Sequence, residues 1–134
     1  MNLVEQLIRI DTKKASERET KQIVSSRLSK LMGEETKITI TELSGKRLND
    51  LAQIILDKNG NKNMSKVYDM NLMYCVYGIV DPSMKDERLM EHFGAKTPKD
   101  LVEILFQAEA GKIAGEIAAL TGATPEAEEE VKNS

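Results

Sequence analysis

Apolar residues recur mainly at intervals of three and four along this chain, a spacing typical of short amphipathic helices. The N-terminal residues 2–10 predict such a helix, with an apolar face formed by Leu3, Val4, Leu7, Ile8 and Ile10. This apolar face needs a surface to cover it, either the protein's own core or another protein. The spacing does not decide between the two, although burial in a core is the commoner use.

The next stretch combines two patterns. Residues 19–32 fit one helix face by their apolar spacing, whereas residues 37–41 alternate polar and β-branched side chains as a half-buried strand does. A strand needs a neighbour for its backbone hydrogen bonds, and the nearest candidate is residues 21–28, with residues 32–35 as the connection. The pattern therefore favours a short β-hairpin, and it leaves open whether residues 19–32 form strand or helix.

The middle of the chain predicts two helices separated by a polar turn. Ser44 can cap the first helix, whose apolar face consists of Leu48, Leu51, Ile54 and Ile55. The turn at residues 58–63, KNGNKN, is expected to be an exposed and mobile loop. Residues 67–80 are apolar nearly all round, which is typical of a central core helix, although their Met and Tyr side chains would also suit an adaptable interaction face.

The second half of the chain carries the clearest start and stop signals for helices. Asp81-Pro82 begins a new unit, because proline disfavours helical backbone in the residue before it. Ser83 and Asp86 then predict a capping box, and Gly94 predicts a left-handed helix end. The apolar face of this helix consists of Leu89, Met90 and Phe93.

A second helix start follows at Thr97-Pro98, with Asp100 completing the capping arrangement. This helix places one apolar face at Leu101, Ile104, Leu105 and Ala108. Gly111 and Gly115 are expected to interrupt it. Helical spacing continues to the end of the stretch near residue 122, through Ile113, Ile117 and Leu120.

Together these elements predict an α+β fold, a mainly helical small domain with one short β-hairpin. The length of 134 residues suits a single domain, which we place at residues 1–122. Residues 123–134 are acidic and have almost no apolar positions, so we expect them to form a flexible tail.

The residue types offer no catalytic or metal site. Cys75 is the only cysteine and lies in an apolar run, which predicts a buried free thiol, and His92 is the only histidine. The chain has no glycine-rich phosphate loop and no nucleophile with a plausible base. We therefore expect a non-enzymatic binding protein without a metal or cofactor. The N-terminus lacks signal-peptide features and no window approaches the roughly 20 apolar residues of a membrane span, so we expect a cytosolic protein without membrane contact.

Charge separates the two halves of the chain. Residues 1–66 carry 13 Lys and Arg against 9 Asp and Glu, whereas residues 67–134 carry 6 against 13. Opposed halves would suit a homo-oligomer, although ordinary solvation explains such a pattern as well. Residues 89–98 and the helix after them also imitate a helix-turn-helix DNA-binding regulator. That helix starts with one lysine and two acidic residues in the acidic half of the chain, so we expect no nucleic-acid binding.

Several short motifs follow one another in a characteristic order. They are RLSK at 27–30, ITIT at 38–41, GIVDPS at 78–83, LMEHFG at 89–94, TPKDL at 97–101 and GEIAALTG at 115–122. In this order they resemble the XkdN-like phage tail assembly chaperones, and the resemblance covers most of residues 20–122.

The resemblance implies a small non-enzymatic protein of a tailed phage or prophage, acting in the bacterial host cytoplasm. Its implied partners are the tape-measure protein, whose apolar helices it would keep in solution, and the tail-tube protein. A structural tail component that stays in the virion is an alternative. The resemblance also raises a longer, frameshifted form, whose extension would begin near residues 126–134.

The candidate protein-binding residues lie on the last two predicted helices. They would shield the apolar helices of a client or mediate self-association, although the same spacing also defines a core face. They are Leu101, Ile104, Leu105, Phe106, Ile113, Ile117 and Leu120.

Overall fold

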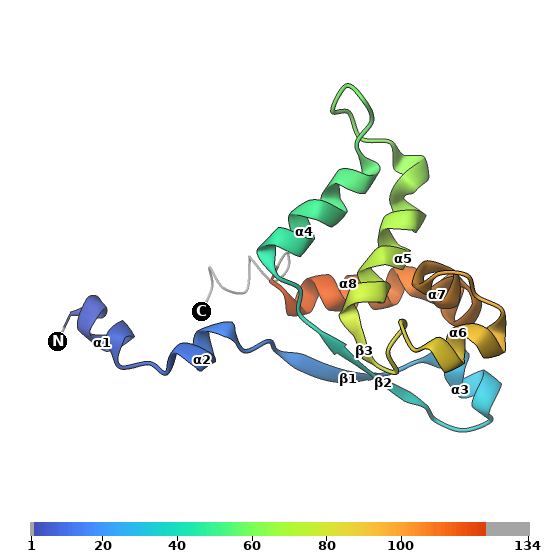
Figure 1. The fold of residues 1–134 in the computed structure, drawn as a ribbon, viewed down its shortest axis with the longest axis horizontal. Helices are drawn as coiled ribbons and strands as arrows, with labels where there is room; N and C mark the ends of the chain where they lie inside the picture. Colours follow the sequence, from blue (N-terminus) through green and yellow to red (C-terminus); the bar gives the residue numbers. More distant parts are fainter. Residues whose placement is uncertain (1, 123–134) are drawn as a thin grey trace.

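In the computed structural model, which describes residues 2–122, an antiparallel sheet is packed on one face by helices (Figure 1). Ile38 and Ile40 of the central strand are buried under these helices. The strands, in spatial order, are β1 (Thr20–Val24), β2 (Lys37–Thr41) and β3 (Ile79–Asp81). The mainly helical α+β fold expected from the sequence is confirmed.

The helical layer is organised around α5, which packs against both α7 and α8, while α8 also contacts β2. In chain order the helices are α1 (Leu3–Ile8), α2 (Thr12–Ser16), α3 (Ser26–Met32), α4 (Gly45–Ala52), α5 (Val67–Gly78), α6 (Glu87–Phe93), α7 (Pro98–Phe106) and α8 (Glu109–Leu120), with 3-10 turns at Gln53–Ile55 and Met64–Lys66. The proposed acidic tail, residues 123–134, lies outside the described residues.

The predicted pairing between the two halves of residues 19–41 is confirmed, but the connection is longer than a hairpin turn. β1 and β2 pair antiparallel, with Ile23 opposite Ile38, and α3 lies between them. For residues 19–32, the strand interpretation therefore holds for β1 and the helix interpretation holds for α3. The switch occurs at Ser25, whose Oγ accepts a hydrogen bond of 3.1 Å from the backbone N–H of Leu28 and so caps α3.

The third strand was not predicted from the sequence. Residues 67–80 were expected to form one helix, but α5 ends at Gly78 and the chain continues as β3 beside β2. The reason is a tertiary contact. Ile79 and Val80 are both β-branched and suit a strand, but they form one only because β2 lies beside them and supplies backbone hydrogen-bond partners. The rest of the expectation, a central core helix, is confirmed by the burial of Leu72, Cys75 and Val76.

The start of α6 differs from the expected one. Asp86, not Ser83, caps α6, because its carboxylate accepts hydrogen bonds from the backbone N–H groups of Arg88 and Leu89. The Arg88 side chain beside it holds the pKa of the Asp86 carboxyl below its usual value. Ser83 instead closes a turn by accepting from the N–H of Lys85. The expected starts of α4 at Ser44 and of α7 at Thr97 are confirmed by hydrogen bonds to their side chains.

The break between the last two helices lies at Gln107, not at Gly111 or Gly115. Gln107 has φ 52°, a positive value that ends α7, whereas both glycines lie inside α8. The predicted loop at residues 58–63 is largely exposed and turns at Gly60 with φ 79°, and its mobility stays a prediction.

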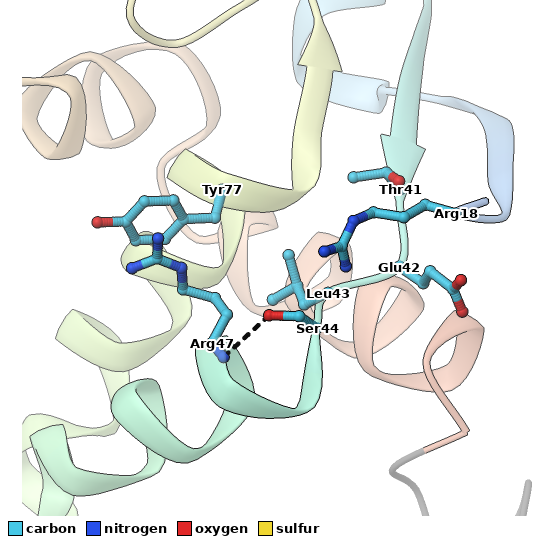
Figure 2. Close-up of a pocket in the computed structure, with 7 residues that line it drawn as sticks. All are labelled: Arg18, Thr41, Glu42, Leu43, Ser44, Arg47 and Tyr77. Atoms are coloured by element: carbon cyan, nitrogen blue, oxygen red, sulfur yellow. Dashed lines mark hydrogen bonds between the residues drawn. The ribbon is translucent and has the colours of Figure 1, made fainter. Parts of the chain in front are cut away.

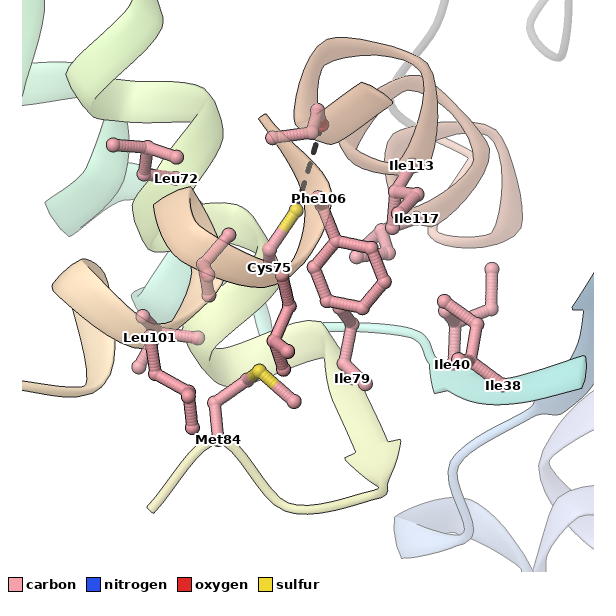
Figure 3. Close-up of a cluster of buried hydrophobic side chains, with 14 of the residues drawn as sticks. Ile38, Ile40, Leu72, Cys75, Ile79, Met84, Leu101, Phe106, Ile113 and Ile117 are labelled. Carbon is pink, nitrogen blue, oxygen red and sulfur yellow. Dashed lines mark hydrogen bonds between the residues drawn. The ribbon is translucent and has the colours of Figure 1, made fainter. Parts of the chain in front are cut away.

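The core lies where α5, α7 and α8 meet the sheet, and Phe106 is at its centre (Figure 3). Cys75 lies in this core, where its Sγ–H donates to the carbonyl of Ala110 over 3.4 Å. Burial, with a smaller effect of the negative charge on Glu109, raises the pKa of Cys75 to about 12. The expected buried free thiol is confirmed, and it stays protonated at neutral pH.

Gly78 marks the closest approach between α5 and α8. A Cβ at this position would lie 2.9 Å from Cγ1 and Cγ2 of Ile117, and closer still to Cδ1. Ile117 is fully buried, so it has little room to move aside. The absence of a side chain at residue 78 therefore lets α8 lie directly against the end of α5.

Gly78→Ala is expected to lower the free energy of unfolding by about 1–3 kcal/mol, because the added methyl overpacks this contact. Chemical denaturation followed by circular dichroism measures the change. Gly115→Ala on α8 is the matched control, because a Cβ there meets open space, and it should stabilise the helix by about 0.5–1 kcal/mol. Equal effects of the two substitutions would contradict the proposed packing constraint.

Candidate protein-binding surfaces

The seven residues expected to face a client come from α7 and α8, and the structure buries most of them. Ile104 and Leu120 are half-buried and keep some exposed area. The other five form part of the core: Leu101, Leu105, Phe106, Ile113 and Ile117. In this conformation they contact the protein's own helices and sheet, so a client would reach them only if α7 and α8 separated from α5. Their role in client binding stays a prediction.

The exposed apolar surface that the structure does show gathers at the N-terminus. There, α1 and α2 form an arm, residues 2–17, that extends away from the body of the protein (Figure 1). None of the arm residues is buried or half-buried. Its large apolar side chains are between 44% and 77% exposed: Leu3, Val4, Leu7, Ile8 and Ile10.

The helix predicted at residues 2–10 is therefore confirmed as α1. Of the two alternatives left open for its apolar face, the commoner one, burial in the protein's own core, is wrong. Asn2 caps it by accepting a hydrogen bond of 2.9 Å from the N–H of Glu5. A helix of one or two turns without tertiary contacts is marginal in water. Within the residues that the structure describes, the apolar face of this capped helix is left uncovered. Periodicity reveals such a face in the sequence, but it does not reveal what covers it.

A cross-connection at the start of α3 holds the body together next to the last two helices. The carboxylate of Glu109 accepts hydrogen bonds from Ser25 Oγ and from the backbone N–H groups of Ser26 and Arg27. In the opposite direction, Arg27 Nε donates to the carbonyl of Leu105 over 3.1 Å. The negative charge of Glu109 thus lies at the N-terminus of α3, and the positive charge of Arg27 lies at the C-terminal part of α7. The helix dipoles favour both placements.

Beside this connection lies a hollow of about 550 Å³, lined by α3 and by the junction of α7 and α8. Its lining mixes the basic side chains of Arg27 and Lys30 with the segment from Phe106 to Glu109. On the same helix α3, Leu31 and Met32 are largely exposed. This is a second apolar surface, smaller than that of the arm.

A smaller hollow of about 240 Å³ lies where α4 meets α5 (Figure 2). The guanidinium of Arg47 lies over the ring of Tyr77, 3.8 Å from its centre, and Arg18 reaches toward the same hollow. The hollow is smaller than the roughly 300–1,000 Å³ of ordinary ligand pockets. We assign the stacked Arg47–Tyr77 pair a structural role, because a cation–π contact of this kind fixes α4 against α5.

The imitation of a helix-turn-helix is limited to the turn itself. Gly94 ends α6 in the left-handed conformation, and α7 follows at Pro98. Lys99, the basic residue at the start of α7, forms an ion pair of 2.9 Å with Asp69 of α5. Its charge is therefore partly neutralised within the protein, and the neighbouring Asp100 repels phosphate.

Within residues 2–122, no group of three His, Cys, Asp or Glu side chains is placed to hold a metal ion. A search of the same residues found no helix with the length and apolar character needed to span a membrane.

Glu109→Ala is expected to lower the free energy of unfolding by about 1–2 kcal/mol, because the N-terminus of α3 loses its charged acceptor. Glu116→Ala is the matched control on the same helix. Glu116 makes a surface ion pair of 3.3 Å with Lys21, which is more than half exposed, so its loss should cost less than about 1 kcal/mol. Thermal unfolding of both variants measures the difference, and a larger effect at Glu116 would contradict the assignment.

A comparison with curated proteins found no match, and a comparison with solved structures found none either. A family model described as phage XkdN-like tail assembly chaperone protein matches residues 4–133, nearly the whole chain. This chain therefore belongs to the family of XkdN-like phage tail assembly chaperones, which are non-enzymatic proteins that act on phage tail proteins.

Proposed function

We propose that this protein binds the tape-measure protein of its phage in the cytoplasm of the bacterial host, keeps that protein's apolar helices in solution and assists assembly of the tail tube. Membership of the family supplies the class of function. The observation that carries the choice of a binding surface is the exposed apolar face of α1 on the N-terminal arm.

The spacing of this face fits recognition of another helix. Val4, Leu7 and Ile8, at positions i, i+3 and i+4, lie on one side of α1 and match the spacing of the anchors that an amphipathic helix presents to a partner. Complete burial of one such side chain is worth about 1.5–3 kcal/mol. Ordering the arm opposes part of this gain. Several anchors together still leave a net attraction for apolar helices.

The two half-buried residues on the last helices extend this proposal to the body. Ile104 and Leu120 keep exposed area, so they are available to a client without any change of conformation. The five buried candidates on α7 and α8 could contact a client or a second copy only in a conformation in which these two helices have separated from α5.

The test is co-expression with the tape-measure protein of the same phage, followed by size-exclusion chromatography with light scattering. Wild-type protein should yield a soluble complex with a client that is insoluble alone. The double variant Leu7→Asp with Ile8→Asp should weaken the complex about 100-fold, because two apolar anchors are lost. Its thermal stability should match that of the wild type, since neither residue contributes to the core.

Met64→Asp is the matched control, because Met64 is an equally exposed apolar residue far from the arm in the sequence. It should leave the complex intact. If the arm variant solubilises the client as well as wild type does, the proposed surface is wrong. If wild-type protein forms no complex at all, the tape-measure protein is not its client.

A structural component of the virion is the second candidate within the same family function. Mass spectrometry of purified phage particles separates the two, because an assembly chaperone leaves the finished tail and a structural component stays in it.

A further inference from the structure

The outer edge of β1 is free in the part of the chain that the structure describes. β1 is the first strand of the sheet, and β2 is its only strand neighbour there. The backbone bonds at both ends of the pairing, from Glu42 N–H to Glu19 and from Ser25 N–H to Thr36, show that odd-numbered residues of β1 bond to β2. In an antiparallel pair the residues between them point their N–H and C=O groups the other way. Thr20, Gln22 and Val24 therefore present these groups outward.

This edge lacks the usual protection of exposed strands. Edge strands are commonly blocked by proline, by a bulge or by a lysine that faces a would-be partner. β1 contains no proline and pairs with β2 without a register shift. Its one lysine, Lys21, turns to Glu116 of α8, 3.3 Å away. The backbone hydrogen bonds of the neighbouring arm, residues 2–17, are all local.

A hollow of about 290 Å³ with a mixed apolar and charged lining adjoins the same edge, between β1 and α8. Ile23, Val24 and Ile113 form its apolar lining, and the charged side chains of Glu109, Lys112 and Glu116 line the rest. Val24 is 46% exposed although it is a strong strand former. A strand added at this edge would cover both the free backbone groups and these side chains.

We propose that β1 pairs antiparallel with β1 of a second copy of this chain, giving a continuous six-stranded sheet across a two-fold axis at Gln22. In the register that pairs all five residues, Thr20 lies opposite Val24 of the second copy and Gln22 lies opposite Gln22. Each of these three residue pairs exchanges two backbone hydrogen bonds. No charged residue faces its like directly across the axis, so the strand is complementary to itself.

The charges that flank β1 favour the same partner. Glu17 and Glu19 precede the strand, with Arg18 between them, so this flank has a net charge of −1. The exposed Lys30 of α3 follows the strand, while the side chain of Arg27 is already bonded to Leu105. Antiparallel pairing places the start of one strand beside the end of the other. The acidic flank of each copy therefore lies beside the basic flank of the other copy, and the dimer contains two such contacts. This complementarity of the chain with itself is the reason for choosing a second copy over an extended segment of a client.

The inference goes beyond the proposed function, because the pairing requires no tail protein. It would also place two N-terminal arms on one particle, one at each end of the paired β1 strands at the centre of the joined sheet. Two arms on one particle would bind a long client more tightly than one arm by raising the local concentration of the second.

The first test is the mass of the client-free protein by light scattering over a range of concentrations. The expected mass is twice the 15.0 kDa of the chain. Gln22→Pro should give a monomer with unchanged circular dichroism, because proline removes an N–H that does not bond to β2. Gln22→Lys, which places two positive charges face to face across the axis, should weaken the dimer about fivefold. Asn49→Lys on the exposed side of α4 is the control and should leave the dimer unchanged.

A cross-linking test fixes the register. Gln22→Cys should form a disulfide-linked dimer on mild oxidation, because the two Cα atoms would lie about 5.5 Å apart. Asn59→Cys in the exposed loop controls for random collision and should stay largely unlinked. A monomer at every concentration overturns the proposal, and so does a dimer that both Gln22→Pro and Gln22→Lys leave intact. A dimer lost only on deletion of residues 2–10 would assign the contact to the arm instead.

Discussion

The contact between Gly78 and Ile117 determines how the helical layer meets the sheet. Gly78 is the last residue of α5 and is followed immediately by β3, so its position is shared by the central helix and the sheet. Because residue 78 has no side chain, Ile117 fills the space beside it and α8 lies against α5. From this position α8 also reaches β2, and Phe106 and Ile113 complete the core around it.

The rest of the body depends on that arrangement. Once α8 is fixed, Glu109 at its start is in place to cap α3, and Arg27 of α3 reaches the end of α7. The segment between β1 and β2 is thereby tied to the last two helices, which are more than 70 residues away in the sequence. Most of the apolar residues of α7 and α8 form part of this closed core. A core face and a binding face have the same helical spacing, so the sequence pattern alone resembled a binding face.

Local signals in the sequence were sufficient for the elements that local chemistry determines. Ser44 and Thr97 cap helices as expected, and Gly94 ends α6, because each acts through its own backbone neighbourhood. β3 was missed because three residues become a strand only when β2 lies beside them. The exposure of α1 could not be decided from the sequence for a related reason: an apolar stripe has the same spacing whether the protein or a partner covers it.

The structure thus divides into a closed body and an arm that buries nothing of its own. For the proposed function this division would have a use, since the body would remain folded while the arm binds and releases apolar helices. The free edge of β1 lies between the two and belongs to neither the core nor the arm's apolar face.

Hydrogen exchange of the complex with the tape-measure protein, compared with the protein alone, distinguishes client binding at the arm from client binding at α7 and α8. We expect backbone amides of residues 3–10 to exchange rapidly in the free protein and to become protected in the complex, while α5 and α8 are protected in both. Protection that appears on α7 and α8 while the arm continues to exchange rapidly would contradict this expectation.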